Sequence, residues 1–477
     1  MNQEEQSGIE PLADTAGNQV QPYRLLLFGA VILALALIGI WSRPSGAFAA
    51  LWPANAVMLV WLARSGSSAS LAHYFCAALA FSAADLMTGA SVGNALILAC
   101  GNLLSVGTGL LFLHLCRLKT IDLSERASVF QVLLLALIGA NAGGLLGMVA
   151  WPKMFGGTFH EGYFYWAGTD FVNYIAFLPL LFAMPASRIE LIRSLRRDLS
   201  QTKVLPAITT LLMCGLPVWT DNPNALAFPL LGLLWCAFTY SVFVTALLTL
   251  LYCLFALLQI SRVFDQGAAD FSGWADLMLI RVSISSIALA PIVVSAYIHS
   301  TRVQVAKLAY SANHDSLTGA LSRAAFMEAL QDRMQSLSDG QCVTLFLMDL
   351  DHFKNINDTH GHLAGDSAIV HFVQVVQQCL RAGDVIGRIG GEEFAVVFAE
   401  ENKEDFDAPL IADRIHKTLN DLPLVLPDGK SLPFTVSIGI AECSTPGDSL
   451  EALVQQADDA LYKAKAAGRD QTVLNRV

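Results

Sequence analysis

Two short acidic stretches in the C-terminal third of the chain carry residue types that could hold a metal ion or move a proton. One is Asp349-Leu350-Asp351, which follows an apolar run, and the other is Glu392-Glu393, which follows Gly390-Gly391. Adjacent carboxylates repel each other, so we expect a cation or a substrate proton to compensate Glu392 and Glu393. Carboxylates at the end of a buried strand are a frequent site for hard cations. A lone Asp-x-Asp is also typical of an ordinary turn or helix cap.

The elements around these stretches follow from the pattern of apolar residues. The continuous apolar run at 343–348 predicts a strand that is buried on both faces. A helix is expected from about 364 to 381, and the strand-like runs on either side of Gly390-Gly391 predict a β-hairpin. Glycine there would let the backbone turn with positive φ and let a ligand approach closely. The alternative is a plain hairpin with two glutamates on its solvated side.

Composition divides the chain into two regions. Of its 477 residues, 54% are hydrophobic and 14% are charged, whereas soluble domains carry about 25% charged residues. The apolar runs lie before residue 300, so we expect a multi-pass α-helical membrane bundle followed by a soluble α/β domain. The net charge of −11 gives no reason to expect binding to a nucleic acid polymer. The nine cysteines lack metal-ligand spacing and are expected to be reduced.

A membrane-spanning helix needs about 20 apolar residues, and the region 23–298 contains about ten candidates. These are 23–41, 47–63, 70–88, 92–115, 127–151, 163–184, 204–220, 224–241, 243–261 and 274–298. Residues 1–22 are polar and lack a basic n-region, which predicts a cytoplasmic tail and not a cleaved signal peptide. The Lys and Arg residues of the loops 116–126 and 185–203 favour the cytoplasmic side for both loops. An even number of spans then returns the C-terminal domain to the cytoplasm.

Several polar residues within these spans are costly to place in a lipid bilayer. They are Asp85, Asn102, Asn141, Asp170, Asn173 and Arg281. They could form a ligand pocket or relay, or they could form hydrogen bonds between packed helices. Asn residues favour the second interpretation, whereas both stay open for Asp170 and Arg281, the candidate sensor residues.

The segment LWPANAVMLVWLA at 51–63 and the many spans with small loops resemble the membrane-associated sensor modules (MASE class) of bacterial signalling proteins. That resemblance covers about the first 300 residues. A transporter would show similar hydropathy. Residues 296–314 continue the last predicted span without Gly or Pro, which predicts a helical connector at 299–314. Its apolar positions, Ile298, Val305 and Ala312 among them, have heptad spacing, but two heptads are too few to predict a coiled coil.

The soluble region carries a set of motifs that resembles one family. The sequence GGEEF at 390–394 is similar to the signature of the GGDEF-domain diguanylate cyclases, in its Glu variant. The family's other motifs are present in order: DSLTGALSR (315–323), with mild departures at Ala320 and Ser322, DLDHFKNINDTHGHLAGD (349–366), FTVSIGIA (434–441) and ALYKAKAAGRD (460–470). The match covers about residues 310–477, and we place the domain at 315–477.

The resemblance implies a palm-like α/β fold of the nucleotidyl cyclase type, with a mostly antiparallel central sheet. The implied reaction condenses two GTP into cyclic di-GMP and releases two pyrophosphates. It implies two Mg²⁺ (or Mn²⁺) ions per active site, held by Asp349, the Leu350 carbonyl and Glu392. Two divalent cations can stabilise the attacking and leaving oxygens together. Glu393 is expected either to complete the metal shell or to help deprotonate the 3′-hydroxyl.

The same resemblance assigns substrate-binding residues. Asn357 and Asp366 are expected to read the guanine, and an Asp there would reject adenine. The triphosphate is assigned to Lys354, Lys465 and Arg469, and Phe353, Gly390 and Gly391 complete the substrate site. Lys465 and Arg469 are four residues apart, so on a helix they would share a face. The alternative is a solvated basic helix end, which the helix dipole favours.

Arg381 and Asp384 stand where the family has the RxxD motif of its product-inhibition site, which implies that cyclic di-GMP binds there as an inhibitor. The alternative is a turn after a helix, with Gly383 making the break. One domain holds one GTP, so catalysis is expected to require a homodimer. The connector is then the expected switch, since a signal that pairs or rotates two copies would shift the population of facing domains.

The leading interpretation is a diguanylate cyclase of the bacterial inner (cytoplasmic) membrane, controlled by its membrane domain and by its product. A second interpretation is a degenerate domain that acts as a cyclic di-GMP receptor, which is disfavoured because the carboxylates and Lys354 are present. A third is a transporter with a regulatory domain, and the internal repeats that would favour it are not apparent. A cyclase for another nucleotide is disfavoured by Asp366.

Overall fold

The computed structural model forms two compact units, Met1–Arg302 and Val303–Val477, which we call the helical unit and the sheet unit. The structure describes residues 22–43, 49–65, 71–118, 120–123, 125, 127–185, 187–198, 203–220, 222–265, 274–338, 341–400, 407–427, 429–444 and 449–475. Apart from Pro22, the predicted N-terminal tail lies outside these residues.

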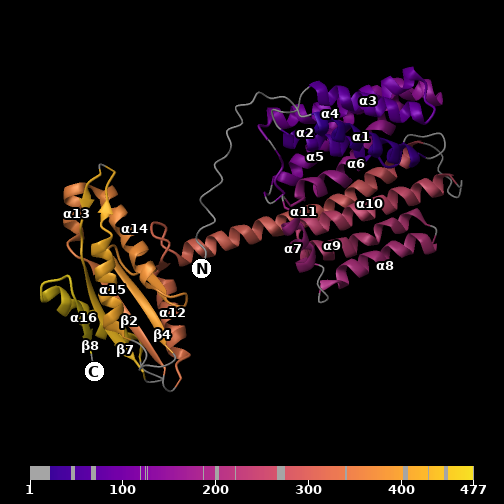
Figure 1. Ribbon diagram of the computed structural model, residues 1–477. Coiled ribbons are helices and arrows are strands. Elements are labelled where there is room, and N and C mark those ends of the chain that lie inside the picture. The colour runs from indigo at the N-terminus through magenta and orange to yellow at the C-terminus, as the bar shows by residue number, and fades with distance from the viewer. Residues whose placement is uncertain are drawn as a thin grey trace. The chain divides into compact units, whose positions relative to one another are not determined.

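The helical unit is built from helices joined by short connections (Figure 1). They are α1 (Pro22–Trp41), α2 (Pro53–Ser65), α3 (Leu71–Met87), α4 (Val92–Leu115), α5 (Ser128–Phe155), α6 (Phe159–Ala183), α7 (Arg188–Asp198), α8 (Leu205–Thr220), the 3₁₀ helix η3 (Pro223–Ala227), α9 (Pro229–Thr239), α10 (Val242–Asp265) and α11 (Trp274–Asn313). Helix α7 falls in a segment predicted to be a loop. Its sequence RIELIRSLRRD is amphipathic and rich in Arg, so it lacks the apolar run by which the other helices were predicted.

Six helices in the described part of the chain are long and apolar enough to cross a membrane, namely α1, α4, α5, α6, α10 and α11. The apolar segments Leu71–Met87, Leu205–Thr220 and Ala225–Thr239 are shorter than this, and α2 has only 13 residues. A membrane protein is therefore indicated, and the count of about ten crossings stays a prediction.

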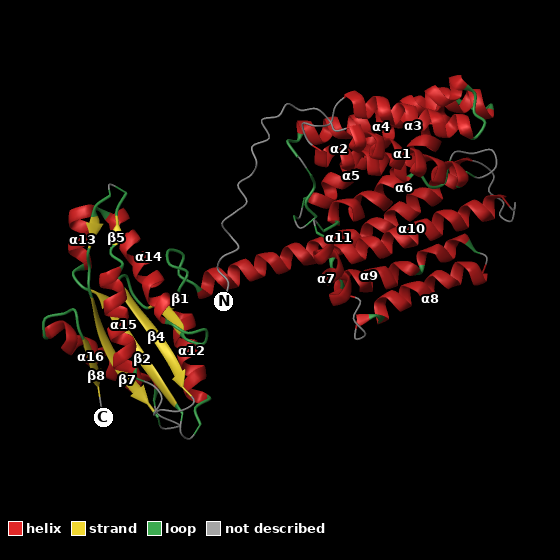
Figure 2. Cartoon of the chain, in the orientation of Figure 1, coloured by secondary structure: helices red, strands yellow, loops and turns green. Residues whose placement is uncertain are grey.

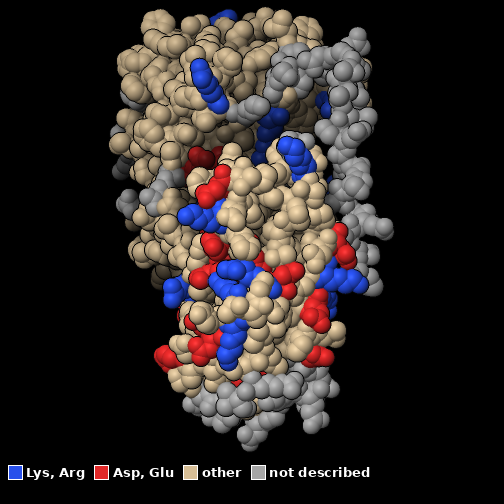
Figure 3. Space-filling view, turned by 90° about the vertical axis from the view of Figure 1, so that its left-hand side faces the viewer, with Lys and Arg blue, Asp and Glu red and all other residues tan. Residues whose placement is uncertain are grey.

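The helical unit turns many large apolar side chains outward. Trp41 is 79% exposed, Leu71 is 88% exposed and Trp219 is 83% exposed. In Figure 3, acidic and basic side chains are interspersed over the sheet unit, whereas the helical unit shows mainly uncharged atoms. A lipid bilayer would cover such an apolar surface favourably, while water would not.

Helix α11 runs unbroken from Trp274 to Asn313, through the residue at which the two units divide. Its N-terminal part is apolar and packs in the helical unit, where Ala288 and Ile292 are buried. Its C-terminal part belongs to the sheet unit, and there Val305 is 59% and Leu308 is 69% exposed. The predicted connector is thus part of one long helix.

The sheet unit contains a six-stranded sheet in the order β1-β3-β4-β2-β7-β8 (Figure 2). Its elements are β1 (Leu321–Ser322), α12 (Arg323–Gln335), β2 (Cys342–Leu350), α13 (Phe353–His360), α14 (His362–Cys379), β3 (Val385–Arg388), β4 (Glu393–Glu400), α15 (Ala408–Asp421), β5 (Leu424–Val425), β6 (Ser431–Leu432), β7 (Val436–Cys443), α16 (Leu450–Ala466) and β8 (Thr472–Asn475). Strands β5 and β6 form a separate two-stranded sheet.

The predicted mostly antiparallel sheet is confirmed at its centre. Strands β3, β4, β2 and β7 pair antiparallel, whereas β1 pairs parallel to β3 and β8 parallel to β7 at the edges. Among the described residues the sheet is therefore mixed, with three antiparallel pairings and two parallel ones. The predicted hairpin at Gly390-Gly391 is confirmed as the β3–β4 pair.

Both faces of this sheet are covered, which explains the unbroken apolar run of β2. Phe346 and Met348 pack in a core with residues of α14 and α15, whereas Val343 and Leu345 pack on the other face with residues of α12 and α16. Alternation of side chains between the two faces of a strand requires this division. The predicted burial of the strand on both faces is confirmed.

The N-terminal motif of the sheet unit forms a compact turn around Asp315. Its carboxylate accepts hydrogen bonds from Thr318 N at 3.0 Å and from Thr318 Oγ1 at 2.7 Å, and Gly319 takes a φ of +72°. Arg388 Nη1 in β3 lies 3.0 Å from Asp315 Oδ1. Burial alone would raise the pKa of Asp315, but the bonds from Thr318 and Arg388 and the charge of Arg388 hold that pKa below its ordinary value.

We expect Asp315→Asn to destabilise the sheet unit by about 1–2 kcal/mol at neutral pH, because the half-buried Arg388 would lose its counter-ion. A carboxylate whose pKa is lowered by folding stabilises the folded state fully at pH values above its pKa in the unfolded chain. This stabilisation is lost as the pH falls through its pKa in the folded state. The difference between wild type and Asp315→Asn should therefore shrink below pH 3.8. Calorimetric unfolding at several pH values measures it, and a difference that grows on acidification would contradict the assignment.

Candidate active site

Three carboxylates meet at one end of the central sheet. Asp349 in β2 lies opposite Glu393 in β4, and Leu350 N donates to Glu392 O at 3.3 Å across the same two strands. Asp349 is 7% exposed, while Glu392 is half-buried and Glu393 is exposed. The structure thus places the acidic residues of the two stretches that the sequence singled out beside each other.

The two glycines before this pair act differently from what the sequence predicted. Neither Gly390 nor Gly391 has a positive φ, so the predicted backbone reason was wrong. A Cβ at position 390 would lie 2.5 Å from Glu393 Oε2, so glycine there makes room for that carboxylate. A Cβ at position 391 would meet no atom within 4 Å, which leaves the hairpin open on that side.

Lys465 is a basic residue in contact with one of these carboxylates. Its Nζ lies 2.7 Å from Asp349 Oδ2. Burial raises the pKa of Glu392, the charges of Asp349 and Glu393 raise it further, and the charge of Lys465 opposes them. One lysine beside three carboxylates leaves an excess of negative charge, so a further cation would stabilise the ionised site.

The donor set suits a divalent cation with few protein ligands. Asp349, Glu392 and the Leu350 backbone offer only oxygen atoms, which Mg²⁺ and Mn²⁺ prefer. Among the described residues, no group of three or more His, Cys, Asp and Glu side chains is arranged so that it could hold a metal ion. Mg²⁺ keeps several waters and uses substrate phosphates as ligands, so the sparse set fits an ion that arrives with a nucleotide.

The helix that carries Lys465 ends earlier than predicted. Helix α16 stops at Ala466, Gly468 has a φ of +120°, and Arg469 lies beyond the helix with a φ of +66°. The prediction that Lys465 and Arg469 share a helix face was therefore wrong, because Gly468 ends the helix between them. A Cβ at Gly439 in β7 would collide with the backbone of α16 at Leu461, so that glycine lets α16 pack directly on the sheet.

Asp351 fixes the turn after α16, a role that the sequence analysis missed. Its carboxylate accepts hydrogen bonds from Thr435 Oγ1 and Ser437 Oγ, both at 2.7 Å, and from Asp470 N at 3.0 Å. Asp351 is 4% exposed. Because Asp470 directly follows Arg469, this carboxylate ties the predicted triphosphate-binding segment to the strand end that carries Asp349. Thr435 and Ser437, two hydroxyl residues at the start of the buried strand at 436–443, are the sequence feature that could have indicated this role.

The predicted guanine-reading residues lie on consecutive helices. Asn357 is on α13 and Asp366 is on α14, with Gly361 at a φ of +82° between them. A Cβ at Gly365 would collide with the Asn357 side chain, so this glycine brings Asn357 against the turn that carries Asp366.

Two residues predicted to bind substrate differ in exposure, although they are adjacent in α13. Phe353 is 8% exposed and packs in the core under the sheet, while Lys354 is exposed. Phe353 would therefore affect a substrate only indirectly, by positioning α13.

The Arg381–Asp384 segment forms a closed turn after α14. Asp384 Oδ2 accepts from Arg381 N at 2.8 Å, and Asp384 N donates to Arg381 O at 3.1 Å. Arg333 of α12 donates to Gly383 O at 2.5 Å and to Val397 O at 2.7 Å, which anchors this turn to β4. The geometry fits the alternative of a structural turn, and it also leaves the Arg381 residue exposed.

The polar residues of the helical unit mostly serve its packing. Asn173 accepts a hydrogen bond from Trp52 N at 2.8 Å, and Asn102 accepts one from Trp52 Nε1 at 2.9 Å. Asn141 accepts one from Tyr163. Asp85 forms an ion pair with Arg43 at 2.9 Å. The two candidate sensor residues, Asp170 and Arg281, are both buried, and no ion pair joins them in the described part of the unit.

Oxygen donors suited to a divalent cation lie beside Lys465, which is suited to a phosphate, and this combination fits phosphoryl-transfer chemistry. The family description "Diguanylate cyclase, GGDEF domain" matches residues 312–471. The probable diguanylate cyclase DgcF of Escherichia coli K12 is 33% identical over 275 residues, which cover 57% of this chain and 86% of that protein. The chain belongs to the GGDEF-domain diguanylate cyclases.

Other relatives match mainly in the sheet unit. The probable diguanylate cyclase DgcC of Escherichia coli K12 is 37% identical over 175 residues, which cover 36% of this chain and 45% of that protein. The crystal structure of the GGDEF domain of DgcB from Caulobacter crescentus in complex with c-di-GMP is 30% identical, covers 35% of this chain and 96% of that chain, and has a TM-score of 0.32.

We expect Asp351→Asn to raise the KM for GTP, the expected substrate, by about tenfold, with a smaller fall in kcat, because the segment bearing Lys465 and Arg469 would lose its anchor. Steady-state kinetics of the purified full-length protein measures both constants. The exposed Asp458→Asn on α16 is the matched control and should leave both unchanged. A fall in kcat with no change in KM would indicate only a loss of folded protein and would contradict the positioning role.

Proposed function

We propose that this chain is a membrane-bound cyclase that condenses two GTP into cyclic di-GMP and two pyrophosphates, under the control of its helical unit. The observation that carries this proposal is the meeting of Asp349, Glu392 and Glu393 beside Lys465 in a member of this family. The cytoplasmic side of a bacterial inner membrane is the proposed location, as the basic loops at 116–126 and 185–203 predict.

The chemistry needs the 3′-hydroxyl of one GTP to attack the α-phosphorus of the other in line with the departing pyrophosphate. Two Mg²⁺ or Mn²⁺ ions, bound by Asp349, Glu392 and the Leu350 carbonyl, would supply charge stabilisation for the attacking and leaving oxygens. Lys465 lies close enough to the carboxylates to exchange Asp349 for a phosphate oxygen. Lys354 and Arg469 are exposed, so both are accessible to a triphosphate.

Base recognition is assigned to Asn357 and Asp366. An Asp carboxylate accepts from N1–H and N2–H₂ of guanine, and adenine offers neither donor in that arrangement. A nucleotide without these donors would leave the Asp366 carboxylate without its hydrogen bonds to the base and would bind more weakly. The exposed position of Asp366 at the start of α14 leaves its carboxylate free to meet a base.

A homodimer is the proposed active form, since each sheet unit offers one set of these residues and the product contains two nucleotides. The exposed Val305 and Leu308 on the C-terminal part of α11 support pairing with a second copy, because a helix buries such a stripe favourably against another helix. Asp315, which ends the turn after α11, is linked through Arg388 to the hairpin of the site. Pairing of α11 is therefore a suitable point of control.

We expect wild-type protein in nanodiscs with GTP and Mg²⁺ to form cyclic di-GMP, and Glu392→Ala to lower the rate by at least about a hundredfold, since a metal carboxylate is lost. Product analysis by chromatography and mass spectrometry measures the rate. Exposed Glu328→Ala on α12 is the control and should retain activity. Equal rates in wild type and Glu392→Ala would contradict the assigned metal site, and conversion of GTP to another product would contradict the proposed reaction.

Product inhibition is proposed at Arg381 and Asp384. We expect Arg381→Ala to leave the initial rate within about twofold of wild type and to raise the cyclic di-GMP concentration for half-inhibition at least about tenfold, because a charge-assisted contact to phosphate is lost. Initial rates at several added product concentrations measure this. Unchanged inhibition in Arg381→Ala would favour the alternative in which the segment is only a structural turn.

A further inference from the structure

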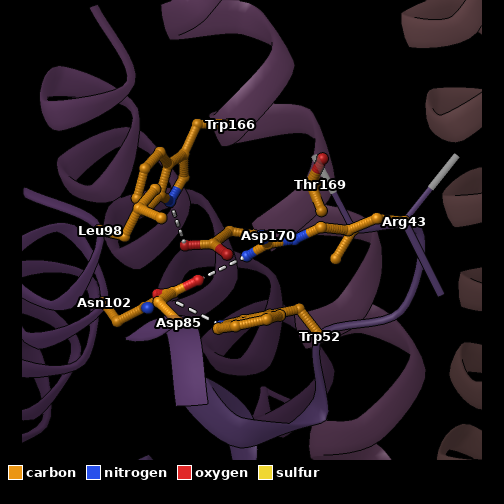
Figure 4. A pocket seen from close by; sticks show the side chains of 9 residues that line it. Arg43, Trp52, Asp85, Leu98, Asn102, Trp166, Thr169 and Asp170 are labelled. Atoms are coloured by element: carbon orange, nitrogen blue, oxygen red, sulfur yellow. Dashed lines mark hydrogen bonds and ion pairs between the residues drawn. The ribbon is translucent and has the colours of Figure 1, made fainter. Parts of the chain in front are cut away.

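The helical unit contains a pocket that neither the catalytic assignment nor the packing of the helices explains. Its cavity volume is about 40 Å³, and its lining includes Arg43, Trp52, Asp85, Asn102, Trp166 and Asp170. Figure 4 shows these side chains converging from several segments of the unit. This volume is far below that of sites for drug-sized ligands, so only a very small molecule would fit.

The charges of the lining do not cancel. Arg43 and Asp85 form an ion pair at 2.9 Å and neutralise each other. Asp170 is 3% exposed, and within the described part of the chain no ion pair joins it to a Lys, Arg or His. Its oxygens accept hydrogen bonds from Asn55 Nδ2 and Trp166 Nε1, all at 3.3 Å, and Ser105 is a further hydrogen-bond partner. All three partners are neutral, so an ionised Asp170 would have no opposite charge beside it.

Aromatic rings complete the pocket. Trp52 and Trp166 both line it, with their indole N–H groups directed to Asn102 and Asp170. The face of an indole ring attracts an organic cation, most strongly where water is excluded. A buried carboxylate between two tryptophans therefore suits a small ammonium group and disfavours an anion.

The pocket adjoins the helix that continues into the sheet unit. Thr169 lines the pocket beside Asp170, and Arg281 of α11 donates a hydrogen bond to Thr169 Oγ1. The Arg281 guanidinium also lies 4.8 Å from the centre of the Tyr165 ring. Arg281 is 3% exposed and closely packed. A displacement of Thr169 would therefore also displace the Arg281 side chain.

We propose that this pocket binds a small organic cation of the alkylammonium class and that its occupancy acts on α11 through the Thr169–Arg281 contact. The second part rests on the proposed control of the cyclase by the helical unit. Asp170 supplies the counter-charge, the Trp52 and Trp166 side chains line the cavity, and the Arg43–Asp85 pair is a further part of its lining. If the N-terminus is cytoplasmic, Arg43 at the end of the first crossing places this side of the pocket toward the opposite face of the membrane.

Binding is tested on the full-length protein in nanodiscs without GTP. Methylammonium chloride or tetramethylammonium chloride is titrated into the protein, with sodium chloride of equal ionic strength as the control. The heat of binding is measured by calorimetry, and the tryptophan fluorescence is recorded in parallel. All eight tryptophans precede residue 303, so the fluorescence reports only the helical unit. We expect saturable binding of at least one ammonium probe, which Asp170→Asn weakens at least about tenfold by removing the charge and Trp166→Phe weakens about threefold.

Two further variants separate a lost site from a lost fold. Asp170→Glu keeps the charge and should bind more tightly than Asp170→Asn. Asp198→Asn changes another buried aspartate of the same unit, which does not line the pocket. Asp198 accepts a hydrogen bond from Ser241 N at 2.8 Å, and the Asp198→Asn variant should bind the probe as wild type does. Binding that is equal in wild type and Asp170→Asn, or no saturable binding of either probe to folded wild type, would overturn the proposed site.

The coupling to α11 is tested by turnover. The ammonium probe should change the rate of cyclic di-GMP formation by wild type, and Arg281→Gln should still bind the probe while its rate no longer responds. A rate that ignores the bound probe in wild type, or that responds equally in Arg281→Gln, would overturn the coupling. If no sample forms cyclic di-GMP, the proposed catalytic function fails, while the titration without GTP still decides the site.

Discussion

The guanidinium of Arg388 connects two parts of the sheet unit, the segment just beyond α11 and the hairpin that carries Glu392. It pairs with Asp315 at 3.0 Å, just beyond the end of α11, and it donates to Gly391 O at 2.7 Å in the hairpin that carries Glu392. A bidentate, planar cation can hold two acceptors in a fixed geometry, which a lysine could not. Arg388 thereby links the hairpin to the segment through which the long helix enters the unit.

Electrostatics explains why so much of the unit converges on the end of β2. Asp349 and Asp351 lie two residues apart, and the protein compensates them by different means: a lysine for the first and three neutral hydrogen-bond donors for the second. In the proposed function, the first arrangement is exchanged for a cation and a phosphate. The Asp351 arrangement is closed by its three hydrogen bonds. The carboxylate proposed to bind metal therefore lies two residues from one that fixes a turn.

The sequence predicted the elements of the sheet unit well because buried strands and glycine-marked turns leave local patterns. It predicted the β3–β4 hairpin and the strand at 343–348, but it failed where the answer depended on contacts between distant segments. Nothing local places Thr435 and Ser437 around Asp351, or Arg333 on the turn at Gly383. In the helical unit, apolar runs mark helices without fixing which of them are long enough to cross a bilayer, as α2 and α9 illustrate. The family motifs supplied residue roles that periodicity alone could not.

The close packing of α16 on β7 at Gly439 has a consequence for how such enzymes lose activity. Any larger residue there would meet the backbone of α16, and a helix displaced as a rigid body would carry Lys465 away from Asp349. The acidic signature would remain intact in such a chain. A survey of genomes that counts active cyclases by the GGEEF residues alone would therefore include silent copies, and the glycine in the SIGIA segment is the position to inspect beside it.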